Sequence, residues 1–483
     1  MILLHDFMVL IAEGGGRCRC LFAAVKEGVF VMAKKWDELT SDEKSEKTFH
    51  SWVSQEDIEF ASPECKKAYR ERATRIKDAI QLKRPDRVPF WLQDHCYFPC
   101  RYTGITYEEA VHNPEIWFAK NKKTFLDFEP DMFFNPGFSI RNSGQAQAAL
   151  DTKNFNWPGH GVGANSPHQY VEGEYMKEDE YDAFIHDLGD FTVRTWLPRV
   201  YGTLEPFATL PPLDTLGLGL PGISEKLVGP ELLSAFRSLY KAGLEATKWN
   251  TAAAAFVEEM KSLGYPLLIG GGGLVPFDYI SDFFRGMRGA MLDMYRRPDK
   301  LLEAMEMLMP KAIEMAMSGP RKTGNPGVFI ALHRGSDGFM SLEQFETFYW
   351  PYLKKLMLVL IEEGLTPCPF LEGSFTTRLK YFAELPKGKI LALIDGTDIY
   401  QAKEFLGDRV CMSGMMPVSL LQVGTPDKVR DYARELIDVV GKNGGFIMAP
   451  RSVMDNANPE LVRVWADFTK EYGDYSSGSS VGT

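Results

Sequence analysis

Short, continuous apolar segments recur along the chain, and they constrain its fold more than any other feature of the sequence. Eight of them, each bounded by Gly, Pro or charged residues, occur at 88–93, 131–135, 265–270, 328–333, 366–372, 389–395, 409–414 and 446–450. Because these segments do not alternate in polarity, we interpret them as parallel strands that are buried on both faces.

Amphipathic helices are predicted between these strands. Residues 426–441 carry one apolar face, with Thr425 as the N-cap and Pro426 at the first helical position, and Asn458 followed by Pro459 opens a similar helix. Eight strands separated by helices favour a (β/α)8 barrel, with a doubly wound open sheet as the alternative.

The remaining parts of the chain surround this predicted barrel. We expect an upstream extension with little structure at residues 1–35 and a helical segment at 36–84. The barrel should occupy residues 85–473, with a lid or insertion at 136–264, and residues 474–483 should form a flexible tail. The insertion is inferred because an interval of that length between two strands is too long for an ordinary loop.

Composition excludes several classes of function. The net charge is −11 and no basic run is present, which argues against nucleic acid as a partner. The seven cysteines are scattered without metal-site spacing, which is typical of the reducing cytoplasm. No secretion signal or apolar span of 18 residues is recognisable, so no membrane partner is expected.

Polar residues follow several predicted strands at their C-terminal ends, where barrels of this kind carry their active sites. The candidates are Asp94, His95, His333, Glu372, Asp395, Arg451 and Ser452. Glu372 ends the apolar run PCPFLE, and a charge there needs water, a partner or a metal to satisfy it. Gly270–Gly273 are interpreted as a turn after strand 265–270, or as a place where a flat ligand approaches the backbone.

Four segments together resemble the uroporphyrinogen decarboxylase superfamily, which includes porphyrinogen decarboxylases and corrinoid-linked methyltransferases. These segments are ATRIKDAIQLKRPDRVPFW, VPFDYISDFFRGMRGAMLDMYRRPDKLLEAME, GFMSLEQFETFYWPYLKKL and LLQVGTPDKVRDYARELIDVVGKNGGFIMAPRSVMDNANPELVRVW. The resemblance covers roughly residues 70–473. It implies a (β/α)8 barrel. It also implies a possible homodimer, because members of the family commonly form dimers.

The chain departs from both branches of that superfamily. The decarboxylases carry an RQAGRY-like segment that holds substrate carboxylates, where this chain has WLQDHCYF; Arg451 and Arg101 would be a poor substitute. The methyltransferases often bind zinc through HxCG and a late cysteine, and the counterparts here are FLEG at 370–373 and Ser452. The resemblance therefore leaves Glu372 as the remaining metal-capable group of that motif.

From this resemblance we predict a methyltransferase that acts between a small-molecule methyl donor or tetrahydrofolate and cobalamin. No DxHxxG motif occurs, so the corrinoid is expected on a partner protein. The predicted catalytic residues are Glu372, His333, Asp395 and Arg451; the predicted substrate-binding residues are Asp94, His95, Tyr97, His168, Tyr170 and Ser452.

A divalent metal such as zinc is predicted at His333 and Glu372, with His95 or Asp395 as a further ligand. The alternatives are a decarboxylase of a tetrapyrrole or another acid and a corrinoid- or porphyrin-binding barrel without activity. For His333 alone, a hydrogen bond that caps a strand is an equally simple interpretation.

Overall fold

The computed structural model describes residues 34–93, 97–139, 143–212 and 227–475, with the short stretches 25–26, 29–30 and 224–225. Most of the predicted extension 1–35 and tail 474–483 lies outside these residues, as do Asp94 and His95. Within the extension, β1 (Val25–Lys26) and β2 (Val29–Phe30) form an antiparallel pair.

Six parallel strands form the central sheet in the order β11-β10-β9-β8-β7-β6. They are β6 (Ile269–Leu274), β7 (Gly327–Ala331), β8 (Thr366–Leu371), β9 (Leu391–Ile394), β10 (Cys411–Met416) and β11 (Phe446–Pro450). Parallel bridges then link Phe90 to Met448, Trp91 to Met132 and Phe133 to Leu267, which lies just before β6. The sheet thereby closes into a ring of eight segments, which confirms the predicted barrel and excludes an open doubly wound sheet.

The first two segments pair less than the sequence predicts. The segments at 88–93 and 131–135 do not form full strands, and each pairs with its neighbours only through isolated bridges. Pro89 has no N–H to donate to a ladder, and the Phe90 N–H donates to the Asp131 carboxylate at 2.7 Å. Side-chain bonds therefore replace part of the strand pairing at this point of the ring.

The four consecutive glycines belong to strand β6, so their interpretation as a turn after a strand was wrong. The reason is the close approach of helix α15 (Pro298–Thr323) to β6. A Cβ on Gly271 would lie 2.8 Å from Pro320 Cδ, and one on Gly273 would lie 3.1 Å from Ala316 Cβ. The packing of this helix therefore accounts for Gly271 and Gly273.

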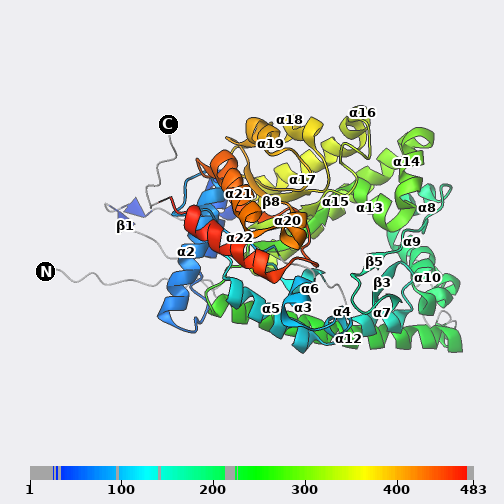
Figure 1. Ribbon diagram of the computed structural model, residues 1–483. Helices are drawn as coiled ribbons and strands as arrows, with labels where there is room; N and C mark the ends of the chain where they lie inside the picture. Colours follow the sequence, from blue (N-terminus) through cyan, green and yellow to red (C-terminus); the bar gives the residue numbers. More distant parts are fainter. Residues whose placement is uncertain are drawn as a thin grey trace.

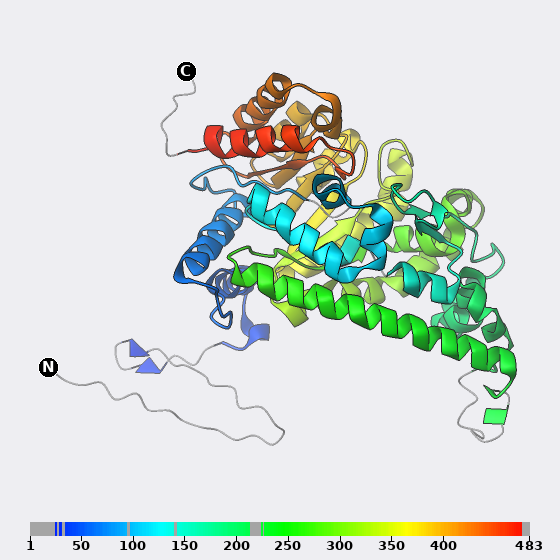
Figure 2. The same ribbon diagram turned by 60° about the horizontal axis from the view of Figure 1, so that its bottom comes forward.

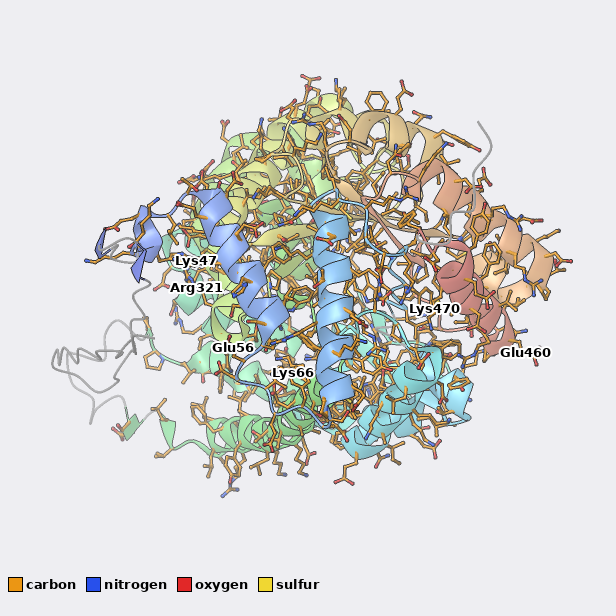
Figure 3. All side chains as sticks on the ribbon, turned by 90° about the vertical axis from the view of Figure 1, so that its left-hand side faces the viewer. Lys47, Glu56, Lys66, Arg321, Glu460 and Lys470 are labelled. Atoms are coloured by element: carbon orange, nitrogen blue, oxygen red, sulfur yellow. The ribbon has the colours of Figure 1, made fainter. Side chains whose placement is uncertain are left out.

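Apolar side chains at alternate strand positions fill the barrel interior, as Leu391 and Leu393 of β9 show. Helices α1 (Ser41–Ser54) and α2 (Pro63–Ile80) lie side by side across the N-terminal end of the barrel (Figure 3). Trp52 of α1 belongs to the same interior cluster, and its Nε1–H donates to the Leu267 carbonyl at 2.9 Å. These two helices close the end of the barrel opposite the predicted site.

Outer helices surround the ring (Figure 1). After β6 they are α13 (Pro276–Tyr279), η5 (Ile280–Arg285), α14 (Gly286–Arg296), α15, α16 (Leu342–Gln344), η6 (Phe345–Tyr349), α17 (Trp350–Glu362), η7 (Thr376–Arg378), α18 (Leu379–Phe382), α19 (Ile399–Leu406), α20 (Val418–Val423), α21 (Pro426–Leu436), η8 (Ile437–Gly441) and α22 (Pro459–Tyr472). The predicted N-caps are confirmed, because Thr425 accepts the Lys428 N–H and Asn458 accepts the Glu460 N–H.

The first part of the chain and the interval 136–264 contribute further helices and a small sheet. They are η1 (Trp36–Glu38), α3 (Phe98–Thr103), α4 (Tyr107–His112), α5 (Pro114–Phe128), α6 (Pro136–Ser139), α7 (Gly144–Leu150), β3 (Phe155–Pro158), β4 (Gly161–Val162), β5 (Gln169–Tyr170), α8 (Tyr181–His186), α9 (Leu188–Phe191), η2 (Thr192–Trp196), α10 (Leu197–Val200), η3 (Gly202–Thr209) and α12 (Pro230–Ser262). The 33-residue helix α12 runs along one side of the molecule (Figure 2). Among the described residues, no helix is long and apolar enough to span a membrane.

A buried arginine fastens the 136–264 interval to the barrel. Arg285 is 2% exposed and donates to Asp293 at 2.6 Å, to the Met176 carbonyl at 2.6 Å and to Glu174. The Tyr181 hydroxyl donates to the same Asp293 carboxylate at 2.7 Å. The segment that contains Glu174 and Met176 is therefore held against the start of α14.

The buried Asp131 should be a main source of stability. Its carboxylate pairs with Arg75 at 2.6 Å and Arg87 at 2.7 Å. Burial alone would raise the pKa of Asp131, but the charges of Arg87 and Arg75 hold it below its ordinary value. We expect Asp131→Asn to lower the free energy of unfolding by about 3–5 kcal/mol at neutral pH, because it leaves two arginines without their partner.

Since the folded pKa of Asp131 is depressed, its contribution is present above the unfolded value of about 3.9 and is lost as the pH falls through the folded pKa. Urea unfolding of both proteins between pH 7 and pH 3 should therefore show a difference that shrinks at the acidic end. The control is Glu129→Gln, whose exposed carboxylate lies 3.8 Å from Lys470 and should change stability by less than about 1 kcal/mol. An equal loss in both variants would contradict the assignment.

The glycine contact between β6 and α15 gives a second prediction. Gly271→Ala should lower the free energy of unfolding by about 1–3 kcal/mol, because the added methyl group overlaps Pro320. Gly243→Ala in α12 is the matched control: no atom lies within 4 Å of its Cβ, and it should stabilise the helix by up to about 1 kcal/mol. Thermal unfolding of the two variants should move in opposite directions.

Candidate active site

Three of the predicted catalytic residues lie at the C-terminal ends of neighbouring strands. His333 follows β7, Glu372 directly follows β8 and Asp395 directly follows β9. Because β7, β8 and β9 are adjacent in the ring, their ends meet at one edge. His333 Nε2 lies 3.6 Å from Glu372 Oε1, and Asp395 accepts the N–H of Gly373 at 3.1 Å.

Two aspartates that our sequence reasoning missed complete this arrangement. Asp278 and Asp282 lie on the α13–η5 segment that leaves β6, four residues apart. Asp282 Oδ2 lies 2.5 Å from His333 Nδ1, and its Oδ1 accepts from Arg334 Nη2 at 3.2 Å. The signal was present in VPFDYISDF, where helical spacing after a strand places two carboxylates on one face. We call Asp278, Asp282, His333, Arg334 and Glu372 the His333 cluster.

The charges of the His333 cluster are strongly coupled. Burial opposes the charged imidazole, but the hydrogen bond and charge of Asp282 raise the pKa of His333 to about 9. Burial raises the pKa of the Glu372 carboxyl above its ordinary value, and the charge of His333 opposes this effect. Burial also raises the pKa of Asp278 to about 7. His333 therefore carries a proton at neutral pH, and Asp278 is partly protonated there as well.

One ring nitrogen of His333, Nε2, makes no hydrogen bond to the other residues of the His333 cluster. Nδ1–H donates to Asp282, and the 3.6 Å separation of Nε2 from Glu372 is too long for a hydrogen bond. Nε2 therefore has room to bond a substrate atom. Glu372 keeps 39% of its side-chain surface exposed, and Gly373 after it adopts φ +80°, which turns the chain at the end of β8. The apolar run PCPFLE thus delivers its acid to the opening of the barrel.

Arg451 and Ser452 follow β11, which lies beyond β10 from the cluster strands. The Arg451 guanidinium donates to the Met415 carbonyl and to the Tyr432 hydroxyl, each at 3.0 Å. Arg101, the other arginine considered as a carboxylate clamp, donates to the Ala457 carbonyl at 2.9 Å. Both guanidinium groups therefore make structural bonds, and neither is aimed at the His333 cluster by those bonds.

Apart from Ser452, the predicted substrate-binding residues fall into two groups. Asp94 and His95 lie outside the described residues. Tyr97 and His168 are brought together, with the Tyr97 hydroxyl 3.2 Å from His168 Nδ1, and the His168 ring lies 6.1 Å from that of Tyr170. The 136–264 interval thus contributes aromatic groups beside the segment that follows the first strand.

Structural and catalytic zinc sites use at least three protein ligands. In the part of the chain that the structure describes, no group of three His, Cys, Asp or Glu side chains is arranged to hold a metal ion. His333 and Glu372 supply two donors, and Asp282 occupies the other nitrogen of His333. The zinc site at His333 and Glu372 therefore stays a prediction.

Comparisons with known proteins agree with this fold. Residues 239–472 match the family model described as uroporphyrinogen decarboxylase (URO-D). The uroporphyrinogen decarboxylase of Chlorobium phaeobacteroides is 24% identical over 176 residues, which cover 34% of this chain and 50% of that protein. The enzyme of Chlorobium phaeovibrioides is 31% identical over 80 residues, covering 16% and 22%. The matched regions thus span half or less of these relatives.

A solved structure resembles a larger part of the chain. The methyltransferase from Methanosarcina mazei superposes with a TM-score of 0.51 over 83% of this chain and 98% of that chain, at 18% sequence identity. At this identity the likeness concerns the fold alone. Together with the closed ring of strands and the match of residues 239–472 to the family model, it confirms the predicted resemblance to the uroporphyrinogen decarboxylase superfamily.

Proposed function

We propose that the protein is a methyltransferase that moves a methyl group between a small-molecule donor or tetrahydrofolate and a corrinoid carried by a partner protein. The observation that carries the proposal is the row Asp282–His333–Glu372 at the C-terminal ends of neighbouring strands. This is the place where barrels of this architecture perform their chemistry. The fold likeness to a solved methyltransferase supports the same choice.

The row supplies what methyl transfer from oxygen or nitrogen requires. When the bond between the methyl carbon and the leaving atom breaks, the bonding pair stays on that atom, which then takes up a proton. Asp282 holds Nδ1–H, so His333 presents the proton on Nε2. The corrinoid supplies the nucleophile that receives the methyl group. In the reverse direction, His333 Nε2 takes the proton back.

Each neighbour of His333 has a distinct part in this step. Asp282 stabilises the charged imidazole and fixes which nitrogen faces the substrate, as a carboxylate commonly does for a catalytic histidine. Glu372 lies on the open side of Nε2, where its carboxyl group is placed to bond the same leaving atom or a neighbouring polar group. Asp395 holds the backbone after Glu372.

The charges of the site disfavour the decarboxylase alternative. A tetrapyrrole with several carboxylates needs several cations, whereas the His333 cluster offers one arginine and the charged His333 beside three carboxyl groups. Arg451 and Arg101 already donate to neighbouring groups. Like charges at the opening would repel such a substrate. We therefore expect no release of CO₂ from uroporphyrinogen; measured release that depends on His333 would replace the methyltransferase proposal.

Substitutions at His333 and Glu372 test the proposal directly. Purified protein is mixed with reduced cobalamin and a panel of methylated donors, and transfer is followed by the visible spectrum of the corrinoid. We expect His333→Gln to lower the rate by about 10²–10⁴-fold, because the proton donor is lost, and Glu372→Gln to lower it less. His186→Gln changes an exposed histidine on α8 and should leave the rate unchanged.

An unchanged cobalamin spectrum with every donor, for the wild-type chain, would refute methyl transfer and favour the binding-only barrel. Metal content is measured on the same samples. A stoichiometric divalent ion that is lost in both His333→Gln and Glu372→Gln, but kept in His186→Gln, would establish the predicted metal site.

A further inference from the structure

The turn that carries His333 is held from behind by one buried carboxylate. Asp278 is fully buried, and its Oδ1 accepts the Arg334 N–H at 3.1 Å while its Oδ2 accepts the His333 N–H at 3.3 Å. Because an unpaired buried carboxylate is costly, these bonds fix the backbone of both residues at once.

The hydroxyl of Tyr349 supplies the shortest bond to the same carboxylate. It donates to Asp278 Oδ2 at 2.6 Å from the end of η6, and the tyrosine is fully buried. This donor reaches the site from a different element than the α13–η5 segment. Tyr349 therefore ties η6 to the carboxylate that holds the His333 turn.

The ring of Tyr349 also shapes the turn. A Cβ built on Gly335 would lie 2.6 Å from Tyr349 Cε1, so the residue after Arg334 must be glycine while this ring is in place. Phe277 and Phe345 pack on the other sides of the ring, with centroids at 6.2 and 5.7 Å. The segment 333–335 therefore lies between the Asp278 carboxylate, which bonds its backbone, and the ring of Tyr349.

Phenylalanine would fill the same space, so packing alone does not explain the hydroxyl. What the hydroxyl adds is the orientation of Asp278, and through it the place of the His333 and Arg334 backbones. A histidine must be held within a fraction of an ångström for its proton to reach the reacting atom. Asp282 bonds the side chains of His333 and Arg334, whereas Asp278 bonds the backbone to which those side chains are attached, and Tyr349 holds Asp278.

We infer that Tyr349 is a positioning residue of this site, which acts through the hydrogen bond to Asp278 and the ring contact with Gly335 to place His333 and Arg334. The inference rests on the proposed function only for its effect on rate. Its effect on the His333 side chain is open to observation in a protein of any activity.

The test compares Tyr349→Phe with Tyr181→Phe. Tyr181 is a matched control, because it is 2% exposed and its hydroxyl donates to an aspartate, Asp293, at 2.7 Å away from the His333 cluster. Each variant loses one buried hydroxyl–carboxylate bond and keeps its ring. Imidazole ¹⁵N spectra at one fixed pH report on the eight histidines, and the His333 signals are assigned with His333→Gln.

In Tyr349→Phe we expect the His333 signals to shift or broaden, and kcat for methyl transfer to fall on the order of 10- to 100-fold with KM little changed. In Tyr181→Phe both should match the wild-type chain. Unchanged His333 signals in Tyr349→Phe, or equal changes in both variants, would overturn the inference. A shifted spectrum in a chain that transfers no methyl group would refute the proposed function and keep the positioning role.

Gly335→Ala provides a second variant that leaves the tyrosine intact. Its methyl group would overlap the Tyr349 ring, so it should shift the same His333 signals. The nearby Gly338→Ala meets no atom within 4 Å and should not. If Gly335→Ala left the His333 signals unchanged, or if both glycine variants shifted them equally, the ring contact would have no positioning role.

Discussion

The barrel depends on one buried ionic cluster, which lies where the strand pairing is least extensive, at the first two strand segments. Asp131 binds Arg75 of α2, Arg87 and the backbone N–H of Phe90, and so joins the helices at the N-terminal end to the first two strand segments. Those segments pair with their neighbours through single bridges, because a proline and the carboxylate itself replace part of the ladder. The positive charges of Arg75 and Arg87 together compensate for the desolvation of the buried Asp131 carboxylate. One arginine alone would compensate for it less well. The closed ring then fixes which strand ends stand next to each other.

That order of strands is what assembles the candidate site. His333, Glu372 and Asp395 are far apart in sequence, but they follow three adjacent parallel strands and meet at one edge. The α13–η5 segment crosses the same edge from β6 and adds two carboxylates. The opposite end is closed by α1 and α2, so chemistry is confined to the end where strands finish. The rigid core therefore serves a site whose members are carried on short turns.

Much of the architecture was predictable from local patterns. Continuous apolar runs indicated strands that are covered on both faces, and Thr425–Pro426 and Asn458–Pro459 marked two helix starts that the structure confirms. Glu372 and His333 were predicted as site residues because they follow apolar strands at the end where such barrels carry their active sites. Asp278 and Asp282 were missed because they lie on a helical segment, where carboxylates are common. The glycines of β6 were misread because their cause, helix α15, begins some twenty-five residues later in the chain.

The sequence by itself determined the periodicity of strands and helices, the resemblance to a superfamily and the residue types available at strand ends, since each of these is encoded within short stretches of neighbouring positions. Only the tertiary structure decided which groups bond. It placed Asp282 on His333, directed the Arg451 and Arg101 side chains to neighbouring carbonyls, and set Tyr349 behind the turn at Gly335. Hydrogen bonds depend on donor–acceptor distances that must be met to within a few tenths of an ångström, here between residues remote in sequence. Such distances exist only once the ring of strands has closed.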